Sequence, residues 1–224
     1  MSLNALIPAA GRGTRFGSWK QYVPIAGRPM LWHAVRAVCM PPVESVFVVL
    51  AHGDREFARH EWNGLGASVE PLYCGGETRR DSVYNALVAA MGLVEADDWM
   101  LVHDAARPCV PRSDVEKLLR EVGDDGVGGI LALPIAETLK RVVDGKVHAT
   151  EDRAQLWLAQ TPQQFRAGLL LRARERAKSA PTDEASAVEQ MGLKPRVVHG
   201  SRENLKVTWP EDLAIAESIL ERRK

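Results

Sequence analysis

The sequence predicts a single α/β domain built on a mostly parallel β-sheet with helices on both faces. Short apolar runs of strand length alternate along the chain with longer amphipathic stretches, an order that is typical of such sheets. Several of the short runs are apolar throughout, as expected of strands that are covered on both faces. The chain of 224 residues is long enough to bury a full core, and no repeat or linker divides it.

The N-terminal half shows the clearest alternation. We expect strands at 3–8, 45–51, 69–73 and 99–103, and helices at 30–38, 55–62 and 78–91. The stretch 45–51, SVFVVLA, is almost wholly apolar, which predicts a buried strand. Within 30–38, an apolar face with helical spacing is formed by Leu31, Ala34, Val35 and Val38.

The C-terminal half continues the pattern with weaker indications. We expect strands at 129–134 and 196–199, and helices from Ser113, at about 168–178 and 183–191, and from Pro210. Ser113 and Glu116 have the spacing of a capping box, and proline suits the first position of a helix. The segment 161–165, TPQQF, is interpreted as a turn, and 204–208, NLKVT, as a strand-like run.

The segment at about 135–158 departs from this order because it contains no long helix. Its residues 139–143 and 146–149 flank Asp144-Gly145, which predicts a β-hairpin around a tight turn. A hairpin that projects from an α/β core is a poor candidate for independent stability. We therefore expect this arm to pack on a second subunit.

Composition excludes several classes of partner. Lys+Arg and Asp+Glu balance at 29 each, so no overall basic field attracts nucleic acid or an anionic membrane. The three cysteines, Cys39, Cys74 and Cys109, have no metal-binding spacing. With no signal peptide and no apolar run long enough to span a bilayer, we expect a cytoplasmic protein.

A glycine-rich loop follows the first predicted strand and indicates phosphate binding. Pro8 to Arg15 reads PAAGRGTR, and Lys20 comes shortly after. Backbone N–H groups beside Gly11 and Gly13 can approach phosphate oxygens, and Arg15 and Lys20 supply positive charge for the same anion. The loop matches neither the P-loop nor the dinucleotide fingerprint. It predicts a nucleoside triphosphate cradle, although the loop alone also fits an ordinary surface turn.

Two further segments fall at the same predicted edge of the sheet. Asp104 follows the strand at 99–103, where a carboxylate beside a triphosphate is a natural Mg²⁺ ligand. Taken alone, it also fits a solvated turn aspartate, and the neighbouring His103 is interpreted as structural. The second glycine turn, 75–82, could contact a base through its backbone and the Ser82 hydroxyl. An ordinary strand-to-helix turn explains that segment equally well.

In combination, these motifs resemble those of one known enzyme family. The chain resembles the 2-C-methyl-D-erythritol 4-phosphate cytidylyltransferases of the non-mevalonate isoprenoid pathway. The matching blocks run in order over almost the whole chain: PAAGRGTR at 8–15, KQY at 20–22, GGETRRDSV at 75–83, VHDAARP at 102–108, TLKR at 138–141, TPQQF at 161–165, TDEA at 182–185 and NLKVTWPEDL at 204–213. The first block is shared by many nucleotidyltransferases, whereas VHDAARP with TDEA and NLKVT is much narrower.

The resemblance implies a Rossmann-like fold and a CTP-dependent transfer in which the phosphate of methylerythritol phosphate attacks the α-phosphorus of CTP and displaces pyrophosphate. It implies catalytic roles for Arg15, Lys20, Arg153 and Lys206, and a Mg²⁺ ligand at Asp104. The nucleotide-binding residues that it implies are Ala9, Ala10, Gly11, Arg12, Gly13, Gly76, Glu77, Ser82 and Ala105. Those implied for the acceptor are Arg107, Thr138, Thr161 and Thr182, besides Lys206.

The resemblance also implies a homodimer that exchanges its arms, because Thr138 and Arg153 match positions that reach into the partner's site. One departure is the loop between Gly13 and Lys20, which is shorter than usual and has Trp19 where proline often precedes the lysine. This departure puts the path of the loop in doubt.

Two alternative functions remain open. A related cytidylyltransferase acting on a pentitol phosphate, such as ribitol 5-phosphate, would share the nucleotide half. A nucleotide-binding module without turnover belongs to another class of protein. The retention of Arg15, Lys20, Asp104 and Lys206 together argues against this second alternative.

Overall fold

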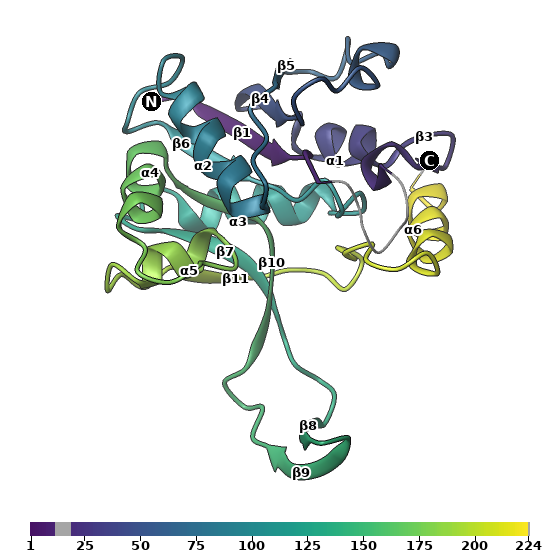
Figure 1. Ribbon diagram of the computed structural model, residues 1–224, viewed down its shortest axis with the longest axis vertical. Coiled ribbons are helices and arrows are strands. Elements are labelled where there is room, and N and C mark those ends of the chain that lie inside the picture. Colours follow the sequence, from purple (N-terminus) through teal and green to yellow (C-terminus); the bar gives the residue numbers. More distant parts are fainter. Residues whose placement is uncertain (12–18, 224) are drawn as a thin grey trace.

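The computed structural model describes residues 1–11 and 19–223 and contains a central seven-stranded sheet (Figure 1). The strand order is β11-β7-β10-β6-β1-β4-β5. In chain order the strands of this sheet are β1 (Leu3–Pro8), β4 (Val43–Val49), β5 (Ser68–Leu72), β6 (Trp99–Val102), β7 (Gly128–Pro134), β10 (Trp157–Arg166) and β11 (Arg196–His199). Two very short strands, β2 (Pro24–Ile25) and β3 (Arg28–Pro29), pair separately.

Most neighbouring strands are parallel, which confirms the predicted fold class. β1 pairs in parallel with β4 and β6, β4 with β5, and β7 with β11, whereas β10 runs antiparallel to both β6 and β7. The turn predicted at 161–165 is therefore wrong, because this segment lies inside β10. Its buried Thr161 and Gln163 side chains are hydrogen-bonded to other segments; Gln163, for example, donates to Asp183 and accepts from the Ala185 N–H. Local composition cannot show such tertiary partners.

Helices cover both faces of the sheet, as predicted. They are α1 (Met30–Val38), α2 (Arg79–Ala90), α3 (Arg112–Val122), α4 (Ala167–Arg176), α5 (Glu184–Glu189) and α6 (Asp212–Glu221). α1 and α3 pack in one apolar core with Ala5 and Ile7, while α2, α4 and α5 pack in another with Leu6. Successive β1 residues thus face opposite cores, as the alternation of a strand requires. No helix in the described residues has the length and apolarity needed to cross a membrane.

Two predicted elements differ in the structure. The helix expected at 55–62 is only a single 3₁₀ turn, η2 (Phe57–Arg59). The Trp62 indole N–H donates to the Phe57 carbonyl at 2.9 Å, and this carbonyl would otherwise accept within a longer helix. The strand-like run at 204–208 contains no strand; its Val207 N–H donates to the Ala106 carbonyl at 2.8 Å.

The predicted hairpin is confirmed and projects far from the body of the molecule (Figure 1). Strands β8 (Leu139–Val143) and β9 (Lys146–Glu151) pair antiparallel. Asp144 and Gly145 both have positive φ, 48° and 73°, as a tight hairpin turn of the primed type requires. The ends of β7 and β10, where Pro134 pairs with Trp157, join this arm to the sheet.

Candidate active site

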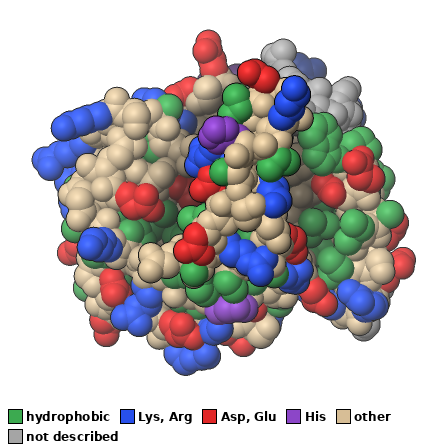
Figure 2. All heavy atoms as spheres, turned by 90° about the horizontal axis from the view of Figure 1, so that it is seen from below, with side chains coloured by type: hydrophobic (Ala, Val, Ile, Leu, Met, Phe, Trp, Pro, Cys, Tyr) green, Lys and Arg blue, Asp and Glu red, His purple; other side chains and the backbone are tan. Residues whose placement is uncertain are grey.

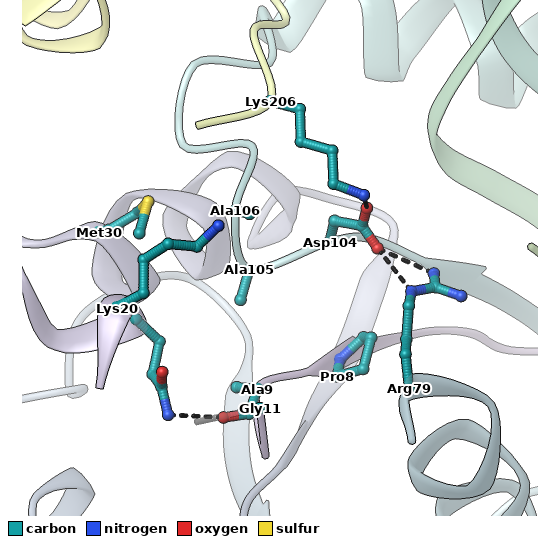
Figure 3. Close-up of a pocket in the computed structure, with 11 residues that line it drawn as sticks. Pro8, Ala9, Gly11, Lys20, Met30, Arg79, Asp104, Ala105, Ala106 and Lys206 are labelled. Atoms are coloured by element: carbon teal, nitrogen blue, oxygen red, sulfur yellow. Dashed lines mark hydrogen bonds and ion pairs between the residues drawn. The ribbon is translucent and has the colours of Figure 1, made fainter. Parts of the chain in front are cut away.

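A cavity opens at the carboxyl ends of β1 and β6 (Figure 3), the edge at which open parallel sheets bind ligands. Its lining residues are Pro8, Ala9, Gly11, Lys20, Gln21, Met30, Arg79, Asp104, Ala105, Ala106 and Lys206. In Figure 3 the Lys20 ammonium lies on one side, and the Asp104 carboxylate lies on the other, flanked by Lys206 and Arg79. The cavity therefore brings together Lys20 and Asp104, which the sequence placed at one edge, and adds Lys206 and Arg79 beside them.

The Asp104 carboxylate is buried and bonded through both of its oxygens. Oδ1 accepts from Nε of Arg79 at 2.9 Å, and Oδ2 accepts from Nζ of Lys206 at 2.8 Å. Burial opposes ionisation, but the Arg79 and Lys206 cations outweigh it and hold the pKa of Asp104 well below its usual range. Asp104 is thus an anion at neutral pH, with Lys206 half-exposed at the cavity beside it.

The backbone of Asp104 is held by a series of hydrogen bonds through the buried side chains of Thr161 and His103. The Asp104 N–H donates to Oγ1 of Thr161 at 3.0 Å, and this oxygen lies 3.1 Å from Nδ1 of His103. Nε2 of His103 lies 3.0 Å from the Arg107 carbonyl, so Nε2 carries the proton and the Thr161 hydroxyl donates to Nδ1. Burial lowers the pKa of His103 to about 4 and keeps the ring neutral. His103 is structural, as the sequence indicated.

The segment after the first glycine loop is anchored to two other parts of the chain. Lys20 begins the 3₁₀ turn η1 (Lys20–Tyr22), and its Nζ donates to the Val207 carbonyl at 2.6 Å. Gln21 donates through Nε2 to the Ala9 carbonyl at 2.8 Å. Both ends of the predicted cradle are thereby placed at the cavity. Within that loop, the predicted residues Arg12, Gly13 and Arg15 lie outside the described residues.

The second glycine turn lies against the first. A Cβ on Gly75 would stand 2.3 Å from Cβ of Ala10 and 2.8 Å from the Leu50 carbonyl oxygen, so no larger residue fits there. Ser82 is buried; its hydroxyl accepts from the Gly76 N–H at 3.1 Å and donates to the Thr78 carbonyl at 2.9 Å. This hydroxyl shapes the turn, and the nucleotide contacts of Gly76, the exposed Glu77 and Ser82 stay predictions.

Of the residues predicted for the acceptor, Lys206 lines this cavity, whereas Arg107, Thr138, Thr161 and Thr182 do not. Arg107 is buried and donates to the carbonyls of Asn204 and Ala159, at 2.7 and 3.3 Å. Thr161 is buried as described above, whereas Thr182 is exposed at the start of α5. Thr138 and Arg153 are exposed on the arm, where the Arg153 guanidinium donates to the Ala136 carbonyl. Their roles toward an acceptor stay predictions.

Arg79 and Glu184 are site residues that the sequence reasoning missed. Arg79 occupies the first position of α2 and bonds to both Asp104 and the fully buried Glu184. A signal was present, because an arginine in the first turn of a helix opposes the helix dipole and is stabilised there by a neighbouring anion. Glu184 directly follows the Asp183 cap of α5, and no local pattern indicates its burial.

The site offers limited means of holding a metal. Among the described residues, no group of three or more His, Cys, Asp or Glu side chains could enclose an ion. A single ionised carboxylate beside a triphosphate cradle is nevertheless the arrangement in which Mg²⁺ is shared between protein and substrate phosphates. The donor set therefore fits a magnesium ion that arrives with a nucleotide.

A mostly parallel α/β sheet with Lys20, Lys206 and the Asp104 carboxylate around a cavity at its carboxyl edge indicates the class of nucleotidyltransferases. A model of the 2-C-methyl-D-erythritol 4-phosphate cytidylyltransferase family matches residues 3–222. The chain belongs to this family, and the resemblance found in the sequence is confirmed.

Similar proteins cover nearly the full length of the chain. The 2-C-methyl-D-erythritol 4-phosphate cytidylyltransferase of Azoarcus sp. (strain BH72) is 52% identical over 98% of this chain and 94% of that protein. The crystal structure of a 4-diphosphocytidyl-2C-methyl-D-erythritol synthase has a TM-score of 0.85 and 40% identity, with 98% of both chains covered. The cytidylyltransferase of Francisella tularensis has a TM-score of 0.79 and 36% identity over 98% of this chain and all of that one.

Proposed function

We propose that this chain transfers the cytidylyl group of CTP to 2-C-methyl-D-erythritol 4-phosphate, giving 4-diphosphocytidyl-2-C-methyl-D-erythritol and pyrophosphate. The observation that carries this proposal is the convergence of Lys20, Lys206 and ionised Asp104 on one cavity at the end of the glycine-rich loop. Membership of the cytidylyltransferase family supports the choice of nucleotide and acceptor.

The chemistry matches the residues at the cavity. The acceptor phosphate is already anionic when it attacks the α-phosphorus, so the reaction needs cations that offset crowded negative charge more than it needs a base. Lys20 and Lys206 supply such cations from two segments of the chain. His103, which is neutral and bonded through both nitrogens, is not placed to act as a base.

Asp104 would hold the magnesium ion. Mg²⁺ favours one or two carboxylates together with phosphate oxygens and water, and Asp104 is the ionised carboxylate at the cavity. When bound, the ion would neutralise triphosphate charge and orient the leaving pyrophosphate. The protein itself keeps the Asp104 carboxylate ionised and holds its orientation through hydrogen bonds from Arg79 and Lys206.

The arm would complete the active site of a second copy of this chain. Val142, Val143 and Val147 are each more than half exposed on the hairpin, and burial against a partner would remove this apolar surface from water. In Figure 2, the face seen from below shows basic and acidic side chains interspersed rather than a field of one sign. Thr138 and Arg153 lie on this arm and do not line their own cavity. In a homodimer with exchanged arms, Thr138 and Arg153 would contribute to the active site of the partner subunit.

A cytoplasmic location fits the cysteines. Cys39, Cys74 and Cys109 are free thiols, two of them buried. Burial raises the pKa of Cys39 and of Cys109 to about 11, so neither is a reactive thiolate. A reducing compartment preserves such thiols.

The function is tested by pyrophosphate release with CTP and a panel of polyol phosphates. We expect release with methylerythritol phosphate and little with ribitol 5-phosphate. Release with ribitol 5-phosphate alone would instead select the pentitol-phosphate enzyme, and no release with any acceptor would favour a non-catalytic nucleotide-binding module. A mock preparation from cells that carry an empty vector, purified in parallel, shows whether a contaminating enzyme produces the signal.

A further inference from the structure

Five side chains of alternating charge form a continuous row that ends in the cavity. Arg174 donates to Glu184 at 2.5 Å, Glu184 accepts from Arg79 at 3.0 and 3.1 Å, Arg79 donates to Asp104 at 2.9 Å, and Lys206 donates to Asp104 at 2.8 Å. The Arg174–Glu184 end is almost inaccessible to solvent, with side chains 1% and 0% exposed. The Lys206 end is 48% exposed. The row thus connects the buried interior of the protein to the cavity.

Arg79 is the central link of this row because it bonds to two carboxylates at once. Its Nε and one Nη reach Asp104, while both Nη atoms reach Glu184. A guanidinium supplies these donors in a fixed planar fork, whereas a lysine ammonium is a compact point charge. Burial opposes its charge, but Glu184 and Asp104 outweigh this and raise the pKa of Arg79, so it stays a cation.

Glu184 is linked to the cavity through Arg79. Glu184 is fully buried and is not among the residues that line the cavity. Its carboxylate accepts from Arg79 and from Arg174, and Arg174 lies on α4, away from the site. Because of this position, Glu184 does not contact a nucleotide bound in the cavity. An effect of a Glu184 variant on CTP binding would therefore be indirect.

We propose that Arg79 and Glu184 are positioning residues that fix the direction in which Asp104 presents its carboxylate to a metal–nucleotide complex. Glu184 holds the guanidinium of Arg79, and Arg79 holds Oδ1 of Asp104, so that the carboxylate keeps one orientation before the ligand arrives. This inference rests on the proposed function, because it assigns Asp104 to the metal. Partners that orient a metal ligand typically change metal affinity by about 10–100-fold when they are removed.

The test measures CTP binding by calorimetry with and without Mg²⁺, so that it does not depend on turnover. The gain in CTP affinity on adding Mg²⁺ is compared among the wild type, Arg79→Lys, Glu184→Gln and the double variant. Arg80→Lys is the matched control, because Arg80 is the next residue of the same helix turn and is exposed. Melting temperatures establish that each variant is folded.

We expect the magnesium-dependent gain to fall about tenfold in each single variant, with CTP affinity in the absence of metal changed less than twofold. The double variant is expected to be no worse than the singles, because both residues act through one contact. Arg80→Lys should match the wild type in both measurements.

Several outcomes would overturn the inference. Equal losses with and without Mg²⁺ in Arg79→Lys would make Arg79 a direct nucleotide ligand, and a normal gain in either single variant would remove that residue from the positioning of Asp104. Additive losses in the double variant would contradict action through one contact. The inference would also be contradicted if Mg²⁺ did not increase the affinity of the wild type for CTP. If Glu184→Gln fails to fold, Arg79→Lys alone decides.

Failure of the proposed function is a separate result. It would appear as CTP binding without pyrophosphate release from any acceptor. The magnesium-dependent binding of the Arg79 and Glu184 variants could still be measured in that case, and it would still decide whether these residues position Asp104.

Discussion

Nζ of Lys20 lies 2.6 Å from the carbonyl oxygen of Val207, a residue 187 positions later in the chain. The N–H of the same Val207 donates to the carbonyl of Ala106, two residues beyond Asp104. Because Val207 follows Lys206 directly, this one residue joins the segments that carry both cations and the carboxylate. The relative placement of Lys20, Asp104 and Lys206 is therefore fixed by backbone contacts rather than by side-chain attraction alone.

Replacing Lys20 by alanine is expected to reduce kcat while leaving the fold intact. The lysine would stabilise charge that is greatest in the transition state, and a positioned donor of this kind contributes about 10²–10³ in rate. Lys194, which is exposed and does not line the cavity, provides the control Lys194→Ala. Steady-state kinetics and a melting curve measure the two effects, and near-normal turnover in Lys20→Ala would remove Lys20 from the mechanism.

Replacing Asp104 by asparagine is expected to raise the Mg²⁺ concentration needed for half-maximal activity. A neutral amide is a poorer ligand for a hard cation than a carboxylate is, and it also leaves Arg79 and Lys206 without their shared anion. A magnesium titration at saturating CTP measures the change, with the exposed Asp124→Asn as control. An unaltered titration would mean that phosphates alone hold the metal.

His103 makes the stability of the protein depend on pH. Burial lowers its pKa to about 4 in the folded state, whereas an unfolded histidine titrates near 6.5. Between these values the unfolded chain binds more protons, so the free energy of unfolding decreases as the pH falls from about 6.5 to about 4. A difference of this size corresponds to roughly 3 kcal/mol.

Denaturant unfolding at several pH values tests this contribution. His103→Gln retains an N–H donor for the Arg107 carbonyl but cannot titrate. We expect its free energy of unfolding to be lower than that of the wild type at pH 7 and to change less between pH 6.5 and 4. The exposed His52→Gln should keep the wild-type dependence. Equal slopes in all three proteins would show that His103 does not contribute.

Replacing Arg153 by alanine is expected to weaken binding of the acceptor phosphate much more than binding of CTP. A guanidinium can bind phosphate through two parallel hydrogen bonds, and in the proposed dimer Arg153 reaches the partner's site. Separate titrations with CTP and with methylerythritol phosphate measure the two affinities. Equal weakening of both ligands would argue against a specific role at the acceptor.

A mixed dimer tests the exchange of arms directly. When Arg153→Ala and Lys20→Ala subunits combine, one site receives both defects and the other receives neither. Some activity should therefore return on mixing two impaired proteins. If subunit exchange is verified and no activity returns, or if an isolated monomer is fully active, Arg153 acts within its own chain.

Much of the fold follows from local patterns in the sequence. The apolar run at 45–51 and the one-sided spacing of Leu31, Val35 and Val38 lie where strand β4 and helix α1 are found. The Asp144-Gly145 pair fixed the hairpin because both positions need positive φ. These elements could be predicted because their geometry is determined by neighbouring residues.

What the sequence did not show depends on contacts between distant residues. β10 contains Gln160, Thr161 and Gln163, which are buried because partners from other segments satisfy their hydrogen bonds. Arg79 and Glu184 become neighbours only after α2 and α5 have packed on the sheet. Asp104 could be predicted from its place after a strand, but the cations that hold it ionised could not all be identified.

The position of β10 between β6 and β7 has a consequence for the growing chain. During synthesis, the edge of β6 that β10 will cover stays unpaired until the arm has been made and the chain has returned. An open strand edge invites pairing with other chains, so the nascent protein depends on prompt return of this strand. Because the entropy of closing a loop increases only slowly with its length, the arm can lengthen or shorten during evolution with little cost to completion of the sheet.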